Sequence, residues 1–465
     1  MTYAEAIQFL YGLRLFGAKF GLENTFQLAA LAGNPQDRLR FIHVAGTNGK
    51  GSTCAMLESI YRAAGLRTGL FTSPHLVSFR ERIQVNRRLI SEDDVVRLVE
   101  DLRRTGVAPV SIQKIPESKI KDGNRRDACP TFFEFITVMA LKFFAEQKCD
   151  LVIWETGLGG RLDATNIVTP LASVITNIQF DHQQWLGDTL EKIAAEKAGI
   201  IKPGVPVITA EDEPEALAVI EKMARAKNAP LMTVNGRDAA LRRPDSAARC
   251  PYLPLLGDHQ QLNAALALAT VETLQRKIPV SAAAIRTGLE TVQWPGRLQL
   301  VQTESGQAIL LDGAHNIAGA KVLREALSSG TLKRELQRAG SETGAPPKLT
   351  LIIGVLQDKD WPQICRTLAP MAARIFTVPV ASERTADARE LAAACWAANP
   401  AADIAACDSL RRALDQAASD RFVIVTGSLY LVGEALELLG LSPATGDERA
   451  LNEWSVHPQP LPATG

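Results

Sequence analysis

The chain has no excess of charge of either sign, because its 465 residues include 51 lysines and arginines and 51 aspartates and glutamates. This balance argues against a general binder of nucleic acid or of anionic membranes, since such proteins need a basic surface. None of the seven cysteines forms a C-x-x-C pair, so the sequence indicates neither a zinc site nor a disulfide framework. An odd number of scattered cysteines is typical of a reducing compartment, and we expect a cytoplasmic protein.

A long apolar run is also missing. The one long uncharged stretch, residues 164–180, is interrupted by Pro170 and by several polar residues, so we expect no membrane span. The N-terminal segment carries Glu5, Arg14 and Lys19 among its apolar residues, which predicts an amphipathic helix rather than a signal peptide. With a hydrophobic content of 46%, these absences leave a packed globular protein.

Short apolar runs alternate with helical patterns along the chain, which predicts an α/β fold with mostly parallel sheets. The predicted strands are 40–45, 68–72, 150–154, 172–177, 205–209, 308–311, 349–354, 374–378 and 421–425. The predicted helices are 2–16, 51–64, 91–104, 132–147, 189–198, 213–227, 259–275, 281–291, 316–328, 361–369, 386–398, 408–418 and one after Ser428. The chain is too long for one ordinary core, so two domains are expected.

The boundary between the two domains is predicted near residues 292–300, where a Pro-Gly pair ends a helical pattern and a strand pattern follows. This gives an N-terminal domain of residues 1–294 and a C-terminal domain of residues 295–440. The tail, residues 441–465, is rich in Pro, Ala, Thr and Gly, and we expect it to be disordered. The polar, basic segment 105–130 is expected to be a mobile loop.

The stretch HVAGTNGKGST, residues 43–53, predicts a phosphate-binding loop. An apolar strand pattern leads into it and a helical pattern follows at once, so backbone N–H groups can point at phosphate oxygens. Lys50 can reach the terminal phosphates, and a hydroxyl after it can bind Mg²⁺. The match to G-x-x-x-x-G-K-[ST] is imperfect, because Val44 replaces the first glycine and Gly51 separates Lys50 from Ser52. An ordinary glycine turn is the alternative.

Two further stretches place ionisable groups after predicted strands. Glu155 in LVIWETGLGGRLDATN stands at the carboxyl end of a buried strand, where ligands bind in open parallel sheets. It is either a Mg²⁺ ligand or a satisfied acid at a strand end. His182, in the stretch 173–204, is either a structural histidine or a second metal ligand. Lys197 lies among mixed charges, and a solvated helix face is the plain interpretation.

Together these stretches resemble one family. The motifs HVAGTNGKGST, LFTSPHLVSFRERIQVN, ETGLGGRLDATN, FDHQQWLGDTLEKIAAEKAGIIKPG, WPGRLQ and LDGAHN occur in the order found in folylpolyglutamate synthase/dihydrofolate synthase, a family of the Mur ligase superfamily. The resemblance runs from about residue 1 to about residue 440. It implies a P-loop ATPase-like first domain with a mostly parallel sheet and a smaller Rossmann-like C-terminal domain. The GKGS form of the glycine loop is the family's own variant.

The resemblance implies roles for particular residues. The ATP-binding positions would be Gly46, Thr47, Asn48, Gly49, Lys50, Gly51, Ser52 and Thr53 in the loop, with Asn263, Arg297 and Asp312 elsewhere. The metal ligands would be Ser52, Glu155, His182 and Lys197, with the lysine carbamylated so that it becomes an oxygen-donor anion. The substrate would be held by Ser73, Arg82, His315 and Ser428. The catalytic positions would be Lys50, His182, Lys197 and His315.

The implied reaction joins L-glutamate to a pteroate or folate carboxylate at the expense of ATP. Phosphorylation turns the carboxylate into an acyl phosphate, whose leaving group is phosphate, and the glutamate amine then attacks the acyl carbon. The implied partners are dihydropteroate, reduced folates, L-glutamate and ATP, with two Mg²⁺ ions and a monovalent cation such as K⁺, all bound by a monomer. Because water would hydrolyse the acyl phosphate, the two domains are expected to close around a hinge near Pro295.

The choice of substrate is less determined. The GGRLDATN form resembles enzymes that perform both reactions, and Asp163 either pairs with a pterin ring or caps a turn. Phe132 and Phe133 either stack on the pterin or belong to the core. One alternative is a monofunctional folylpolyglutamate synthase. Another is a Mur-type peptidoglycan ligase, whose loop typically has a hydroxyl where this chain has Gly51. A nucleotide-binding switch is the third, although it would leave the metal-ligand candidates without a use.

Overall fold

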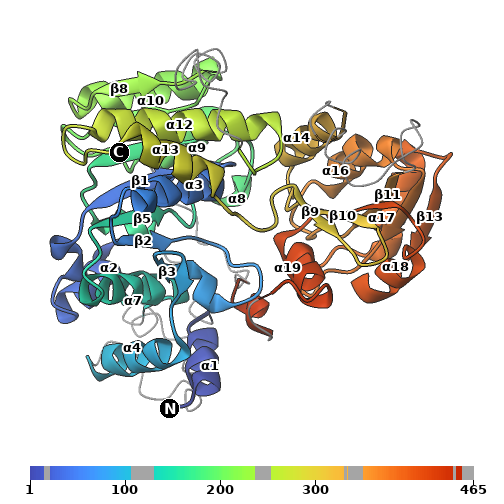
Figure 1. Ribbon diagram of the computed structural model, residues 1–465, viewed down its shortest axis with the longest axis horizontal. Helices are drawn as coiled ribbons and strands as arrows, with labels where there is room; N and C mark the ends of the chain where they lie inside the picture. Colours follow the sequence, from blue (N-terminus) through green and yellow to red (C-terminus); the bar gives the residue numbers. More distant parts are fainter. Residues whose placement is uncertain are drawn as a thin grey trace.

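The computed structural model describes residues 1–14, 21–105, 130–235, 253–328, 332, 349–442 and 447–452. The described chain forms two lobes, each built on its own β-sheet (Figure 1). Apart from its ends, the loop predicted at 105–130 lies outside the described residues. Within the described ranges, no helix combines the length and the apolar character that a membrane crossing requires.

The first lobe contains an eight-stranded sheet in the order β4-β3-β2-β5-β1-β6-β7-β8. Its strands are β1 (Phe41–Ala45), β2 (Thr68–Phe71), β3 (Ile83–Val85), β4 (Arg88–Leu89), β5 (Leu151–Glu155), β6 (Ala172–Ile175), β7 (Val207–Thr209) and β8 (Leu231–Thr233). The run from β2 to β8 is parallel, and β3 and β4 add an antiparallel edge. The carboxyl ends of the parallel strands therefore meet at one edge, where ligands bind in such sheets.

Helices cover both faces of the first sheet. One hydrophobic cluster packs beneath α1 (Tyr3–Leu13), α2 (Glu23–Leu31), α4 (Glu92–Arg104) and α7 (Phe132–Glu146). A second packs beneath α3 (Lys50–Ala63), α12 (Asp258–Leu274) and α13 (Ala282–Glu290), and a third beneath α9 (Leu190–Ala198) and α10 (Pro214–Ala226). Successive strand residues point to opposite faces, so Trp154 belongs to the first cluster and Ile153 to the second.

Short helical turns complete the first lobe. They are η2 (Pro35–Arg38), η3 (Phe79–Arg82), η5 (Ala164–Ile167) and α8 (Gln183–Leu186). Of these, η3, η5 and α8 lie in or next to the motifs that the sequence singled out, so local turns carry the segments between the strand ends and the longer helices.

The second lobe contains a six-stranded sheet in the order β13-β12-β11-β14-β10-β9. Its strands are β9 (Gln299–Gln302), β10 (Ala308–Leu311), β11 (Leu349–Ile353), β12 (Arg374–Thr377), β13 (Asp403–Ala406) and β14 (Phe422–Thr426). Strand β9 is antiparallel to β10, and the other pairs are parallel. The helices α14 (Ile317–Ser328), α16 (Trp361–Leu368) and α17 (Ala388–Ala398) cover one face, with η6 (Ala369–Met371) after α16. The helices α18 (Leu410–Gln416) and α19 (Leu429–Leu438) cover the other.

The predicted α/β class with two mostly parallel sheets is confirmed. Every predicted strand corresponds to an observed one, and β9 begins where a strand pattern was expected after Pro295-Gly296, but β3, β4, β8 and β13 were not expected, nor were α2 and α8. Three of the missed strands, β4, β8 and β13, are short and at least partly exposed, so they carry no continuous apolar run that a sequence pattern would detect.

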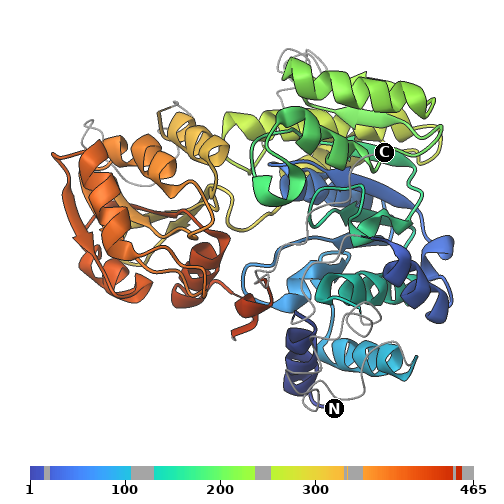
Figure 2. The same cartoon turned by 180° about the vertical axis from the view of Figure 1, so that it is seen from behind.

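The segment after α19 differs from the expectation of a disordered tail over 441–465. Residues Asp447–Asn452 form a 3₁₀ helix, η7, that lies between the lobes and beside the first lobe (Figure 2). Leu451 is 2% exposed and packs into the hydrophobic cluster beneath α1 and α7. The chain after Asn452 lies outside the described residues.

Candidate active site

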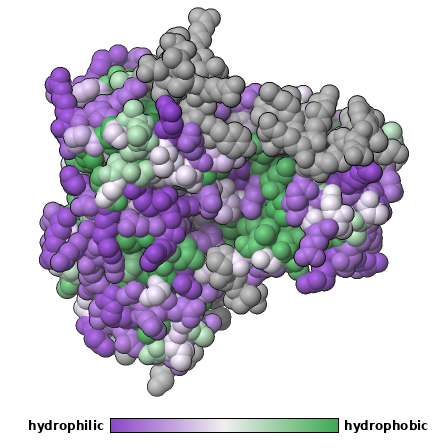
Figure 3. Space-filling model, viewed as in Figure 1, coloured by the Kyte–Doolittle hydropathy of each residue, from purple (hydrophilic) through white to green (hydrophobic). Residues whose placement is uncertain are grey.

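A cleft of about 930 Å³ lies between the two lobes. It is lined by loops at the carboxyl ends of strands from both sheets, and Figure 3 shows the hollow that separates the lobes. The site residues predicted from the sequence line this cleft, with the exception of Thr53, whose side chain is fully buried in α3. The fold therefore gathers segments from distant parts of the sequence around one cavity.

The glycine loop connects β1 to α3 and forms one wall of the cleft. Gly49 caps α3 with a φ of 82°, a left-handed value that favours glycine. A Cβ on Gly46 would lie 1.8 Å from the Thr176 hydroxyl, so only glycine fits there. The Lys50 ammonium donates hydrogen bonds to the carbonyl oxygens of Gly46 (3.1 Å) and Thr47 (3.2 Å). The lysine thus lies across the loop, with a helix N-terminus beside it that favours an anion.

The next strand of the sheet fixes the position of this loop. The Asn177 side-chain oxygen accepts a hydrogen bond from the backbone N–H of Asn48 at 2.8 Å. The Thr176 hydroxyl donates to the carbonyl oxygen of Asn48 at 2.6 Å. Both residues follow β6, so the loop is held by the sheet before any ligand arrives.

Packing against another part of the chain explains why residue 51 is a glycine, which the sequence did not reveal. A Cβ at this position would lie 2.7 Å from the indole ring of Trp294. Trp294 belongs to the connection between α13 and β9 that joins the lobes, and the Arg87 guanidinium lies 5.5 Å from its ring centroid. Gly51 therefore allows the connection between the lobes to contact the first turn of α3.

Glu155 ends β5 and is 3% exposed. Its Oε2 accepts a hydrogen bond from the backbone N–H of Ser73 at 3.1 Å. Burial raises the pKa of Glu155 to about 7, although the charge of Lys50 opposes the shift. Within the described ranges Glu155 forms no ion pair, so its negative charge is free for a cation that enters the cleft.

Lys197 is 4% exposed, which excludes the solvated helix face that its sequence neighbours suggested. Its ammonium donates a 2.7 Å hydrogen bond to the carbonyl oxygen of Gly46 in the glycine loop. Burial lowers the pKa of Lys197 to about 7, and the charge of Lys50 adds to the shift. A substantial share of neutral amine at neutral pH is the form that can react with CO₂.

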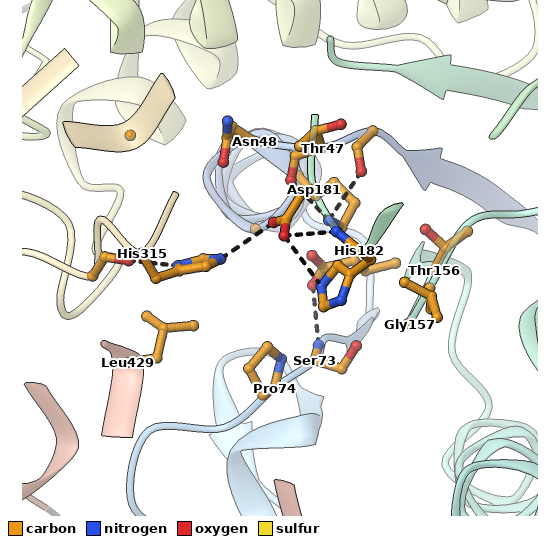
Figure 4. A pocket seen from close by; sticks show the side chains of 18 of the residues that line it. Thr47, Asn48, Ser73, Pro74, Thr156, Gly157, Asp181, His182, His315 and Leu429 are labelled. Atoms are coloured by element: carbon orange, nitrogen blue, oxygen red, sulfur yellow. Dashed lines mark hydrogen bonds and ion pairs between the residues drawn. The ribbon is translucent and has the colours of Figure 1, made fainter. Parts of the chain in front are cut away.

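Asp181 is the main residue of the site that the sequence analysis did not select. Its carboxylate lies between the two lobes, with His182 on one side and His315 on the other (Figure 4). Lys359 forms a 2.6 Å ion pair with it, and the Asn316 amide donates to it at 3.1 Å. Asp181 stood in the quoted FDH motif, but its importance depends on partners from the second sheet.

Two loops of the second lobe contact the first lobe directly: the loop after β10, with His315 and Asn316, and the loop after β11, with Lys359. The Asn316 amide donates to Asp181 and also, at 3.1 Å, to the side-chain oxygen of Asn48 in the glycine loop. His315 orients its ring by a 2.8 Å contact between Nδ1 and the carbonyl oxygen of Gly313. The second lobe therefore contributes individual side chains to the phosphate loop of the first.

The remaining predicted nucleotide residues are held by neighbours in the cleft. Asp312 accepts backbone hydrogen bonds from Leu298 (2.9 Å) and Ala314 (3.0 Å), and burial raises its pKa while Arg297 opposes the shift. On α12, Gln260 links two other candidates. Its side chain accepts a hydrogen bond from Asn263 at 3.0 Å and donates one to the Ser52 hydroxyl at 3.3 Å.

Four of the predicted substrate residues are positioned by their neighbours in the fold. Ser73 precedes a cis peptide bond to Pro74, and its buried hydroxyl has no hydrogen-bond partner within the described ranges. Phe133 is half-buried against Gly157, whereas Phe132 is 8% exposed and packs edge-on to Phe79. Ser428 caps α19 by accepting a hydrogen bond from the N–H two residues later. Phe133 thus presents more of its ring to the cleft than Phe132 does.

Asp163 has contacts on both carboxylate oxygens. One accepts hydrogen bonds from the backbone N–H and the hydroxyl of Thr165, and the other accepts the N–H of Leu158 at 2.7 Å. Burial raises the pKa of Asp163, and the hydrogen bonds from Thr165 oppose that shift. The contacts are those of the turn-capping alternative, and a pterin would have to share the lone pairs that they leave.

The side chains around the glycine loop include oxygen donors of the kind that Mg²⁺ prefers. No group of three His, Cys, Asp or Glu side chains gathers as a metal site among the described residues. Phosphate-bound Mg²⁺, however, needs only one or two protein ligands, because the phosphates and water supply the rest. Two groups fit that requirement: the buried carboxylate of Glu155, which forms no ion pair within the described ranges, and the Ser52 hydroxyl in the first turn of α3.

Two family models match the chain. The Mur ligase middle domain matches residues 44–271, and the glutamate ligase domain of Mur ligases matches residues 296–429. The chain is 36% identical to dihydrofolate synthase/folylpolyglutamate synthase of Bacillus subtilis, covering 93% of this chain and 98% of that protein. It is 34% identical to the Escherichia coli protein of the same name, covering 94% of this chain and 95% of the other.

Solved structures agree with these similarities. Folylpolyglutamate synthase of Thermotoga maritima has a TM-score of 0.77 at 32% identity, covering 96% of this chain and 98% of that one. Escherichia coli FolC in complex with DHPP and ADP has a TM-score of 0.77 at 30% identity, covering 95% of this chain and 98% of the other. The chain therefore belongs to the dihydrofolate synthase/folylpolyglutamate synthase family of Mur ligases and is an ATP-dependent ligase.

Proposed function

We propose that this enzyme joins L-glutamate to the carboxylate of a pteroate or folate through an acyl phosphate, using ATP. The observation that carries the proposal is the juxtaposition of two sets of groups across one cleft. The first lobe presents the glycine loop with Lys50 and the buried Glu155, and the second brings Asn316 to the same loop and His315 to Asp181. A phosphate site faced by polar groups of a second lobe suits transfer of a phosphoryl group to a separately bound acceptor.

Each residue has a task in this chemistry. The loop N–H groups and the Lys50 ammonium would bind the phosphates and stabilise the charge that grows during phosphoryl transfer. Asn263 and Gln260 would hold the nucleotide side of the cleft, and Arg297 with Asp312 would contact the nucleotide from the second lobe. His315 and Ser428 would lie near the incoming glutamate. The cleft between the lobes would exclude water from the acyl phosphate.

Magnesium would be held by Ser52 and Glu155, with His182 and a carbamylated Lys197 at a second ion. Bound there, Mg²⁺ would neutralise phosphate charge. The buried Glu155, which forms no direct ion pair within the described ranges, and the lowered pKa of Lys197, about 7, support these assignments. We also propose a monomeric enzyme, as the family resemblance implies, and a cytoplasmic one, in line with the scattered cysteines.

We further propose that the enzyme both makes dihydrofolate from dihydropteroate and extends the glutamate tail of reduced folates. The names of the Bacillus subtilis and Escherichia coli relatives contain both activities, whereas a Lacticaseibacillus casei relative at 31% identity is named folylpolyglutamate synthase alone. A monofunctional folylpolyglutamate synthase is therefore the second candidate.

Product analysis by mass spectrometry separates the candidates. The enzyme is incubated with ATP, Mg²⁺ and glutamate, together with dihydropteroate or tetrahydrofolate. We expect a mass increase of one glutamate on dihydropteroate and of one or more on tetrahydrofolate. Extension of tetrahydrofolate alone would support the monofunctional candidate, and no glutamate addition to either would contradict the ligase function.

A further inference from the structure

We propose that residues 447–452, the C-terminal strap, position Arg82 so that its guanidinium faces a carboxylate of the folate substrate. The strap follows α19 of the second lobe but binds the first lobe, at the loop between β2 and β3. This inference rests on the proposed function, because it assumes a carboxylate-bearing substrate in the cleft. It assigns Asn452 and His75 as positioning residues and the strap as a part of the substrate site.

The strap is held by one carboxylate with several donors. Glu448 accepts hydrogen bonds from the Tyr3 hydroxyl (3.0 Å), the Ser78 hydroxyl (3.0 Å) and the backbone N–H of Phe79 (2.6 Å). Arg449 forms an ion pair with Glu437 at the end of α19. The strap therefore connects the second lobe to the segment 78–82, whose helical turn η3 ends with Arg82.

His75 connects the strap to Arg82 through hydrogen bonds on both ring nitrogens. The Arg82 Nε–H donates to His75 Nδ1 at 2.8 Å, which requires a lone pair on that nitrogen. His75 must then carry its proton on Nε2, and this N–H donates to the carbonyl oxygen of Glu448 at 2.9 Å. Burial lowers the pKa of His75 well below its ordinary value, in agreement with a neutral ring.

Asn452 completes the support from the other side. Its side-chain oxygen accepts a hydrogen bond from Arg82 Nη2, and its amide donates to the carbonyl oxygen of His75 at 3.0 Å. Arg82 and Asn452 both line the cleft. Two of the three guanidinium nitrogens are thereby fixed by the strap and by His75, while Nη1 forms no hydrogen bond within the described part of the chain.

The environment of Arg82 favours an anionic ligand. Its side chain is 3% exposed and lies over the Phe132 ring, with 5.5 Å between the guanidinium carbon and the ring centroid. Its hydrogen bonds go to neutral acceptors, and no ion pair is formed with it among the described residues. Burial lowers the pKa of Arg82 to about 10, and the nearby charges of Glu81 and Glu155 offset this shift only in part. A folate carboxylate would supply a direct ion-pair partner in the planar geometry that a guanidinium prefers.

The experiment measures steady-state kinetics of full-length variants with tetrahydrofolate, glutamate and ATP. Asn452→Ala should raise KM for tetrahydrofolate by about ten-fold with little change in kcat or in KM for ATP, as loss of a hydrogen bond to a charged group implies. Arg82→Ala should raise the same KM further. The double variant Arg82→Ala/Asn452→Ala should have the same KM for tetrahydrofolate as Arg82→Ala, because the strap acts through the arginine.

The matched control is Asn399→Ala. Asn399 also donates to backbone carbonyl oxygens, those of Ala369 and Ala372, but it lies within the second lobe and outside the cleft. This variant should leave KM for tetrahydrofolate unchanged. Asn452→Ser, which retains a short polar side chain, should give a smaller increase and serves if the alanine variant unfolds.

Two outcomes would overturn the inference. One is an Asn452→Ala enzyme with an unchanged KM for tetrahydrofolate beside an impaired Arg82→Ala enzyme. The other is an Arg82→Ala enzyme whose KM is itself unchanged. In either case glutamate addition by the wild-type enzyme would still be detected by mass spectrometry, so the proposed function would stand on its own test.

Discussion

The two sheet edges that face the cleft contribute to it in different ways. The first edge offers a continuous loop, residues 46–51, with buried charged groups packed around it. The second edge offers single side chains from separate loops, among them His315, Asn316 and Lys359. The first is therefore a preformed cradle, and the second is a set of directional contacts that cross a gap.

The two edges therefore differ in their energetics: the first carries the cost of burying charged groups, and the second contributes a few hydrogen bonds and ion pairs. Desolvation of Glu155 and Lys197 disfavours their charged forms before any ligand binds, as their pKa values near 7 indicate. Each contact across the gap depends on one or two side chains, so each is expected to contribute little on its own. Four predictions test the contrast, beginning with the cradle.

The largest loss is expected from Lys50→Ala. Among the residues that the structure describes, the lysine bonds only to carbonyl oxygens of its own loop, so its removal is expected to leave the packing intact but to remove the charge that would face the phosphates. Turnover should fall by about 10²-fold or more. Turnover is measured beside circular dichroism and thermal unfolding, and near-normal rates in a folded variant would contradict the assignment.

Lys197→Ala should also lose most activity, and acetate should restore part of it by occupying the vacated position. The wild type should depend on CO₂ in a pH-dependent way, because a carbamate forms from the neutral amine. With a pKa of about 7, the ammonium form dominates below that pH and cannot react. Activity in CO₂-depleted buffer should therefore fall more steeply at pH 6 than at pH 8. A wild type indifferent to CO₂ at both pH values would argue against the carbamate.

Gly51→Ala tests the contact between the cradle and the connection between the lobes. The new Cβ would lie 2.7 Å from the Trp294 ring, and overpacking of this kind costs roughly 1–3 kcal/mol. ATP affinity and turnover should both fall, by roughly ten-fold. The double variant Gly51→Ala/Trp294→Leu should recover part of the loss, because the smaller side chain makes room. If the second substitution brings no recovery, the clash is not the cause.

The smallest effect is expected from Asn48→Ala, because the Asn48 side-chain oxygen accepts one hydrogen bond across the gap, from Asn316. Each lost hydrogen bond is worth roughly 0.5–1.5 kcal/mol, so KM for ATP should rise by roughly two- to ten-fold. Asn316→Ala breaks the same contact from the second lobe and also removes the hydrogen bond to Asp181. In a double-mutant cycle the two effects should be less than additive, whereas full additivity would mean that the residues act separately.

The sequence by itself determined what depends on neighbouring residues. The glycine loop, Lys50 and the strand-end position of Glu155 were predictable, because a strand, a turn and a helix start within a dozen residues. The alternation of apolar runs predicted the central strands of both sheets, whereas the partly exposed edge strands β8 and β13 left no clear pattern.

The tertiary structure alone decided which residues meet and which are buried. Asp181 and Lys359 are 178 residues apart, and Arg82 and Asn452 are 370 apart, so no local pattern relates them. Lys197 has the same charged neighbours in either interpretation, and only the packing around α9 removes it from water and lowers its pKa. Desolvation and long-range pairing depend on the whole surrounding fold, whereas backbone geometry and periodicity are local, and this is why the sequence predicted the loop but not its partners.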